Sequence, residues 1–253
     1  MKPLIAIHGQ KFSGKGTIAD YMTKKYGYEH VVISRILKDM SIIFFKEIIH
    51  VNDYNELTDG SLKEIILKNT NNKRPRDIMQ WIGAEFASEV YPNMWIDIVM
   101  KQVSEKLKSG KKIYFDNLRL FPEFNAVYQR NDSSLWYIES LQHYSSGQNE
   151  VFLDYQEKNN YLDVLNDGKT IKSMIDFLFN EMADLSIIYK KEDFEKTLYN
   201  ILKSGIENTL KKENNIHISE QGLDINKFNH IIYNHGTIQD LYNSIDIIMS
   251  EQN

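Results

Sequence analysis

The chain of 253 residues contains no cysteine and only four prolines. Without cysteine it can form no disulfide framework, thiolate zinc site or cysteine nucleophile. It also has no run of about 18 apolar residues, so we expect no membrane-spanning helix and no membrane partner. The start, Met1–Ile5, lacks the long apolar region and the small-residue cleavage site of a signal peptide. We therefore expect a soluble, cytoplasmic protein.

A surplus of basic charge is missing as well. The sequence has 30 Lys and Arg against 35 Asp and Glu, giving a formal net charge of −5. A general nucleic-acid-binding protein usually carries a basic surplus, so we expect no nucleic-acid partner. The net charge does not exclude a local pocket for a nucleotide, because such a pocket needs only a few basic side chains. The hydrophobic fraction of 42% supports a sizeable core, in one large domain or in a domain with an insertion.

The stretch Gly9–Thr17 has the composition of a phosphate-binding loop. An apolar run, Leu4–Ile7, precedes it, and the apolar spacing after it predicts a helix. Gly9 and Gly14 can adopt backbone angles that point successive N–H groups at phosphate oxygens. The helix that begins near Lys15 adds unpaired N–H groups and the positive end of its dipole. The sequence therefore predicts a site for nucleotide phosphates.

The residues expected to bind ATP are Gly9, Lys11, Ser13, Gly14, Lys15, Gly16, Thr17 and Ile18. Lys15 can reach the β- and γ-phosphates, and the Thr17 hydroxyl can ligate Mg²⁺. The form G-x-x-x-x-G-K-G-T, with Gly16 before the threonine, is common among nucleoside monophosphate kinases. A glycine- and lysine-rich turn without a ligand is the alternative, and the strand and helix on either side argue against it.

A carboxylate ends a second apolar strand, expected over 111–116. Asp116 stands at the Walker B position, where a carboxylate holds a Mg²⁺-bound water. Arg119 follows in the loop that leaves the carboxyl edge of the sheet, where ligands of parallel sheets bind. Ser34 is placed to cap a further helix, and Thr237 to cap the last one. Arg35 and Lys38 lie in the first turns after Ser34, as cleft residues or as solvated charges.

Five apolar segments alternate with helical patterns and are expected as strands: 4–7, 30–33, 111–116, 135–138 and 230–233. This alternation predicts a three-layer α/β/α fold of the P-loop NTPase class with a parallel sheet. Residues 142–214 carry helical patterns and no phosphate-binding motif. We expect residues 1–141 and 215–253 to form the P-loop core and residues 142–214 an inserted, mostly helical subdomain or arm.

Five stretches carry a family pattern in a consistent order. They are the P-loop with Ala19 and Asp20; Arg76–Gly83; Tyr91–Asp97; Asn117-Leu118-Arg119 with Glu123; and 217–220 with 232–237. Together they resemble the bacteriophage-type deoxynucleoside monophosphate kinases, leaving 142–214 unmatched. The resemblance implies that ATP phosphorylates a (deoxy)nucleoside 5′-monophosphate to the diphosphate, with Mg²⁺ as cofactor. It is also compatible with a homodimer.

The resemblance assigns roles to the residues singled out above. Lys15, Arg119 and Asp116 would be catalytic, with Arg119 as the cation that spans the phosphates of both substrates. Thr17 and, through water, Asp116 would hold the metal. The expected acceptor-binding residues are Arg35, Lys38, Arg76, Gln80 and Trp95. Gln80 offers an amide that suits a base edge, and Arg76, one helical turn earlier, could pair with the monophosphate.

Other interpretations stay open at this point. Trp95 could wall the base or belong to the core, and for Trp81 the core is favoured. Ser88 stands where the family often has arginine, and the strand ending at Ser140 lacks the arginine that commonly follows it. The alternatives are therefore another P-loop small-molecule kinase, such as an adenylate, shikimate or phosphomevalonate kinase, or a non-catalytic nucleotide-binding regulatory protein.

Overall fold

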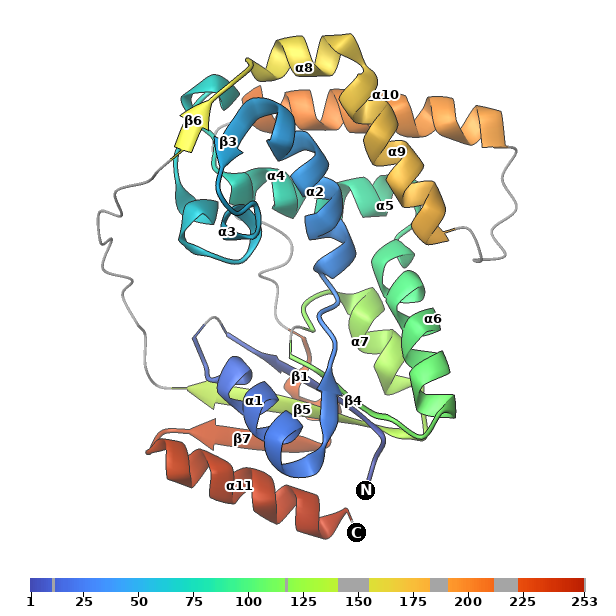
Figure 1. Cartoon of the computed structure of the whole chain (residues 1–253). Coiled ribbons are helices and arrows are strands. Elements are labelled where there is room, and N and C mark those ends of the chain that lie inside the picture. Colours follow the sequence, from blue (N-terminus) through green and yellow to red (C-terminus); the bar gives the residue numbers. More distant parts are fainter. Residues whose placement is uncertain (11, 117, 141–154, 183–190, 212–222, 253) are drawn as a thin grey trace. The chain divides into compact units, whose positions relative to one another are not determined.

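The structure is a computed structural model that describes residues 1–10, 12–116, 118–140, 155–182, 191–211 and 223–252 (Figure 1). Its contacts divide the chain into two compact units. Unit 1 comprises Met1–Ile33, Val99–Gln148 and Ser219–Asn253, and unit 2 comprises Ser34–Ile98 and Asn149–Ile218. Within the described residues, no helix is both long enough and apolar enough to cross a membrane.

Unit 1 is built on a five-stranded parallel sheet. Its strands are β1 (Leu4–Gly9), β2 (Tyr28–His30), β4 (Lys112–Phe115), β5 (Ser133–Ser140) and β7 (His230–Asn234), in the order β2-β4-β1-β5-β7. The central strand β1 is fully buried over Leu4–Ile7, because a parallel sheet covered on both faces requires an apolar run. The expected α/β fold with a parallel sheet and flanking helices is confirmed.

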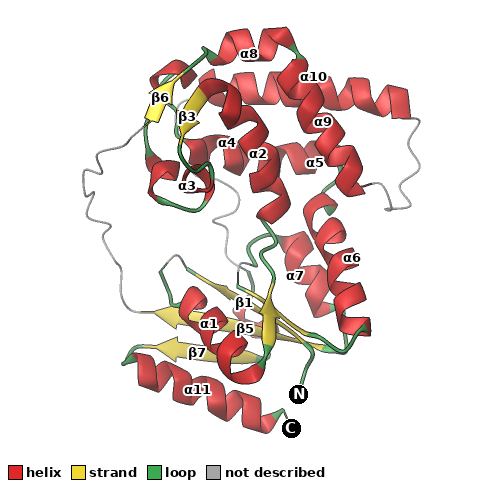
Figure 2. Cartoon of the chain, viewed as in Figure 1, coloured by secondary structure: helices red, strands yellow, loops and turns green. Residues whose placement is uncertain are grey.

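Helices cover both faces of this sheet (Figure 2). They are α1 (Lys15–Tyr26) and α11 (Ile238–Glu251) on one face and α7 (Phe121–Tyr128) on the other. Ile7 and Trp136 point into the core under α1 and α11, whereas the next residue of each strand, His8 and Tyr137, faces the α7 side. Thr237 caps α11 as expected, because its hydroxyl accepts the N–H of Asp240 at 3.2 Å.

Unit 2 is mostly helical. Its helices are α2 (Arg35–Ile48), α3 (Asn55–Thr58), α4 (Pro75–Trp81), α5 (Ala87–Val90), α8 (Tyr161–Asp167), α9 (Lys169–Met182) and α10 (Lys191–Lys211), with a π-helical turn at Ile82–Phe86. Helix α6 (Met94–Lys108) begins in unit 2 and continues in unit 1. A small antiparallel sheet joins β3 (Ile49–Val51) to β6 (Tyr155–Glu157). The sequence predicted neither of these two strands.

Helices α8, α9 and α10 share a core with α2 and α4. Trp81 is 7% exposed, which confirms its expected core position, and its indole lies directly over Gly205 of α10. The Asn71 side-chain amide donates to the Leu210 carbonyl at 2.9 Å. Unit 2 therefore combines residues 34–98 with 149–218, whereas the sequence-based division into a core and an insertion at 142–214 places residues 34–98 with the core.

Two local expectations differ from the structure. The strand expected at 30–33 is found at Tyr28–His30, where it pairs with β4. Ser34 precedes α2 as expected, but its hydroxyl is buried and makes no hydrogen bond to the described residues, so it does not cap the helix through its side chain. The chain enters α2 with Ser34 near φ −76° and ψ 4°, instead of the extended conformation from which a serine hydroxyl usually caps.

The contact between Gly205 and Trp81 gives a first prediction. A Cβ atom on Gly205 would overlap the Trp81 ring. Gly205→Ala should therefore lower the free energy of unfolding by about 1–3 kcal/mol from overpacking, which exceeds the gain of about 0.5–1 kcal/mol in helix propensity. Urea denaturation measures the change. The matched control is Ser204→Ala, at an exposed neighbouring position. Equal stability of the two variants would contradict this packing.

Candidate phosphate-binding site

The connection from β1 to α1 requires glycine at positions 9 and 14. Gly14 has φ 103°, a left-handed conformation that side chains disfavour, and a Cβ there would lie 2.7 Å from the Asn234 amide nitrogen. A Cβ on Gly9 would lie 2.6 Å from the Ile138 carbonyl oxygen of β5. Glycine is thus needed at position 14 for its backbone conformation, and at position 9 because β1 and β5 approach closely there. Lys11, expected to bind ATP, lies outside the described residues.

Lys15 lies folded against its own loop. Its Nζ donates to the carbonyls of Gly9 at 2.9 Å and Gln10 at 2.5 Å. Burial first, and then the charge of Arg119, lower the pKa of Lys15 to about 8, against the opposing charge of Asp116. Arg119 and Asp116 therefore both lie close enough to Lys15 for their charges to act on it. The structure brings the three predicted catalytic residues together in unit 1.

Asp116 follows β4, which pairs in parallel with β1. Its Oδ1 is buried and forms no hydrogen bond with the described residues, although the His30 Nε2 at the end of β2 lies 3.0 Å away. Thr17 is in the first turn of α1 and is partly exposed. A carboxylate oxygen with spare accepting capacity and a threonine hydroxyl fit the oxygen ligands that Mg²⁺ prefers, partly through water.

Two contact residues were not assigned to the site from the sequence. The Asn234 amide, at the end of β7, donates to the Ser13 carbonyl at 2.9 Å and so supports the phosphate-binding loop from a nearby strand end. Asn234 belongs to the family pattern quoted above, which is the signal that could have identified it. His30, beside Asp116, carries no such signal in the sequence.

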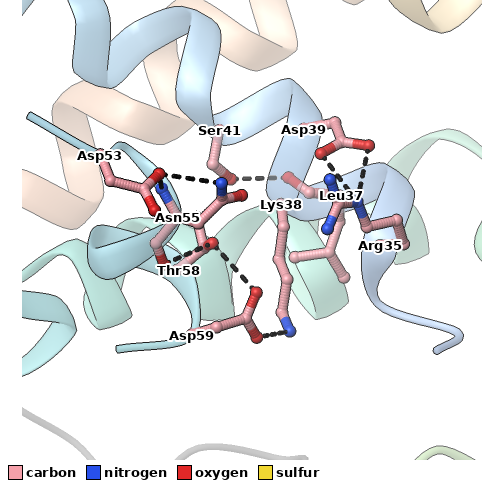
Figure 3. Close-up of polar contacts among 9 residues, drawn as sticks. All are labelled: Arg35, Leu37, Lys38, Asp39, Ser41, Asp53, Asn55, Thr58 and Asp59. Carbon is pink, nitrogen blue, oxygen red and sulfur yellow. Dashed lines mark hydrogen bonds and ion pairs between the residues drawn. The ribbon is translucent and has the colours of Figure 1, made fainter. Parts of the chain in front are cut away.

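The expected acceptor residues on α2 are already paired in unit 2 (Figure 3). The Arg35 Nε lies 3.1 Å from the Asp39 carboxylate, one turn further along the helix. Lys38 forms an ion pair with Asp59, which follows α3. Lys38 is the less exposed of the two cations, at 17% of its side chain against 59% for Arg35. Any anionic ligand would compete with these carboxylates.

Helix α4 carries the next two expected acceptor residues. Arg76 and Gln80 are partly exposed, whereas Ile78 and Met79 between them are buried, so the two polar side chains share the outer face of the helix. The Arg76 Nε donates to Glu64 at 2.5 Å. The acceptor roles of Arg76 and Gln80 stay predictions.

Trp95 lies in the core of unit 2. Its side chain is 3% exposed, and its indole N–H donates to the Gly83 carbonyl at 3.1 Å, inside the π-helical turn. The ring packs near Phe86, with 6.4 Å between the centroids. These contacts favour the core interpretation of Trp95, and its base-binding role stays a prediction.

The described site residues therefore fall into two groups. Unit 1 holds Gly9, Ser13, Gly14, Lys15, Gly16, Thr17, Ile18, Asp116 and Arg119, and unit 2 holds Arg35, Lys38, Arg76, Gln80 and Trp95. Asn117 and residues 217–220, which belong to the family pattern, lie outside the described residues.

The fold is an α/β fold in which a glycine-containing loop joins the central strand of the parallel sheet to the first helix. No family model matches the chain, and no curated protein matches it either. Among solved structures, a dephospho-CoA kinase from Campylobacter jejuni is similar, with a TM-score of 0.42 and 16% sequence identity. The match covers 99% of this chain and 97% of that chain. A similarity of this size assigns neither a substrate nor a reaction.

The lowered pKa of Lys15 predicts a specific pH dependence of stability. The pKa of Lys15 is about 8 in the folded state and 10.5 in the unfolded state. At pH values between these two, the unfolded chain binds more protons at Lys15 than the folded chain does. The contribution of Lys15 to the free energy of unfolding therefore rises with pH across this window. Denaturation of wild type and Lys15→Met should show wild type gaining stability relative to the variant as the pH increases through it. A constant difference would contradict the burial of Lys15.

Proposed function

We propose that the protein transfers the γ-phosphoryl group of ATP to a deoxynucleoside 5′-monophosphate. The observation that carries the proposal is the loop between β1 and α1, with Lys15 as the first residue of α1, Asp116 directly after the adjacent parallel strand and Arg119 just beyond. An acceptor phosphate oxygen bonds to the γ-phosphorus, the bond to the bridging β–γ oxygen breaks, and ADP leaves.

Catalysis of this reaction depends on positioning the two substrates and on positive charge more than on covalent chemistry by the protein. Its transition state spreads negative charge over the transferred group, and fixed cations stabilise that charge. Lys15, with a pKa of about 8, is mostly protonated at neutral pH. Its present hydrogen-bond acceptors are neutral, namely two carbonyls and, at 3.5 Å, the Ser13 hydroxyl, so phosphate oxygens would replace them as stronger, charge-assisted acceptors. Arg119 would add the second cation.

Thr17 and Asp116 are the residues that would hold Mg²⁺, Thr17 through its hydroxyl and Asp116 through water. The bound ion would neutralise charge on the β- and γ-phosphates. The buried Asp116 Oδ1 makes no hydrogen bond to the described residues and has the His30 Nε2 3.0 Å away, so it keeps accepting capacity for a metal-bound water. The protein's part is to hold the carboxylate at the end of β4 and the hydroxyl in the first turn of α1.

For the acceptor, we propose that the outer face of α4 binds the nucleoside monophosphate. Gln80 supplies a carbonyl and an amide for the base edge, and Arg76 a guanidinium for the phosphate. Arg76 would have to exchange its carboxylate partner Glu64 for the substrate. On α2, Lys38 and Arg35 would likewise have to exchange their carboxylate partners, Asp59 and Asp39, for the substrate.

These ion pairs also favour a second candidate function. If the acceptor cations keep their carboxylate partners, the protein binds ATP without transferring its phosphate, as a nucleotide-dependent regulator. Arg35, Lys38 and Arg76 all have such a partner within unit 2. The regulator predicts thermal stabilisation by nucleotide with no ADP formed above background.

The proposal predicts ADP formation when the protein, ATP and Mg²⁺ are mixed with a panel of nucleoside and deoxynucleoside monophosphates. Lys15→Ala should lower kcat by about 100-fold or more, because it removes a cation from the transition state, without a fall in melting temperature that could explain the loss. Phosphorylation of another small alcohol or phosphate, and of no monophosphate, would refute the acceptor assignment. Nucleotide binding without turnover would favour the regulator.

Gln80→Leu tests the acceptor face separately. Losing one neutral hydrogen-bonding group should raise KM for the preferred monophosphate by about tenfold, while KM for ATP stays unchanged. Steady-state kinetics with each substrate varied in turn measures both. A rise in both constants, or in neither, would show that Gln80 does not contact the acceptor.

A further inference from the structure

The segment 118–120, which contains Arg119, forms hydrogen bonds with two side chains that were not expected in the site, His8 and Glu123. We infer that His8 and Glu123 are positioning residues that hold residues 118–120 and thereby fix where the Arg119 guanidinium can reach. The part of this inference that concerns catalysis rests on the proposed function. The anchoring of the segment itself does not.

His8 forms the first anchor. It precedes Gly9 on β1, and its Nδ1 lies 2.7 Å from the Leu118 carbonyl oxygen. A carbonyl oxygen only accepts hydrogen bonds, so Nδ1 carries the proton and donates. The imidazole packs beside Tyr137 and Phe228, with ring centroids 5.8 Å and 5.9 Å away. Burial lowers the pKa of His8 more than the hydrogen bond to Leu118 raises it, and the charges of Lys15 and Arg119 lower it further, which favours the neutral ring.

Glu123 forms the second anchor. Its side chain is buried, with 9% exposed, and a single oxygen, Oε2, accepts the N–H groups of Arg119 at 2.7 Å and Leu120 at 2.9 Å. Burial raises the pKa of Glu123 and these two hydrogen bonds lower it. The acceptor is one oxygen atom, so a neutral amide oxygen at the same place could accept the same two bonds.

Together the anchors fix the backbone on both sides of Arg119. The Leu118 N–H donates to the Ile7 carbonyl at 3.3 Å, so Leu118 is bound to β1 through both its N–H and its carbonyl. Arg119 and Leu120 are bound to the first turn of α7 through Glu123. The guanidinium then moves only by rotation of its own side chain. A displacement of about 1 Å in a reacting geometry can lower a rate by about 100-fold.

Two substitutions of His8 separate its hydrogen bond from its ring. His8→Phe keeps an aromatic ring between Tyr137 and Phe228 but has no donor. His8→Asn loses the ring, and its side-chain amide places a nitrogen close to the position of Nδ1. If His8 acts by donating to the Leu118 carbonyl, His8→Asn should hold residues 118–120 as wild type does, and His8→Phe should not.

Amide hydrogen exchange of the full chain without nucleotide tests the anchoring directly. In His8→Phe the amides of residues 118–120 should exchange about fivefold faster or more, and in His8→Asn at nearly the wild-type rate. Glu123→Ala should accelerate Arg119 and Leu120, and Glu123→Gln should not. Unchanged exchange in both His8→Phe and Glu123→Ala would overturn the inference, and the Glu123 pair decides it if His8→Phe does not fold.

A double-mutant cycle tests the catalytic part. His8→Phe should lower kcat about tenfold with KM for the acceptor nearly unchanged, and it should have less than about a twofold effect in an Arg119→Ala background. An equal loss in both backgrounds would overturn the positioning role. If wild type transfers no phosphate but the exchange rates change as expected, the proposed function fails and the anchoring stands.

Discussion

Parallel pairing of β1 with β4 and β5 is the constraint on which the candidate site depends. The register places Ala6 beside Phe115 and Gly9 beside Ile138, so the residues that follow these strands emerge at one edge of the sheet. Asp116 and Lys15 come to that edge from different parts of the sequence. The same pairing leaves no room for a side chain at Gly9, because the Ile138 carbonyl is too close. Glycine at position 9 is therefore favoured twice, by the phosphate-binding motif and by the packing of β1 against β5.

At this edge of the sheet, the hydrogen bonds of Lys15 go to neutral groups. The Lys15 ammonium donates to neutral loop oxygens, and burial lowers its pKa. In unit 2, by contrast, the expected acceptor cations are matched by carboxylates such as Asp59 and Glu64. Phosphate binding at the loop would replace neutral partners of Lys15, whereas binding at α2 or α4 would displace carboxylates. This difference makes the loop better supported as an anion-binding site than the cations of α2 and α4.

Much of unit 1 could be predicted from the sequence because its signals are local. The glycine spacing of the P-loop, the apolar run before it and the cap at Thr237 are each contained within a short stretch. Backbone conformation and burial set such short-range patterns, and the sequence records both directly. The position of Asp116 at the end of a strand could be predicted for the same reason, since it directly follows an apolar segment.

The remaining features depend on contacts between distant segments. His8 sits in an apolar strand and gives no sign that it bonds to Leu118, 110 residues later. Trp81 indicates a buried position, but not that Gly205 makes room for it. The pairing of β3 with β6 joins segments that are each only three residues long, too short for a periodic pattern. Tertiary packing decides these features, and a single sequence does not show which segments meet.

The proposed phosphoryl transfer is tested most directly by a crystal structure of the protein with a non-hydrolysable ATP analogue, Mg²⁺ and a deoxynucleoside monophosphate. We expect Lys15 to leave the Gly9 and Gln10 carbonyls and to bind the β- and γ-phosphates, with the metal held by Thr17 and by a water on Asp116. A triphosphate bound elsewhere, or a Lys15 that keeps both carbonyl contacts beside the bound nucleotide, would contradict the proposal.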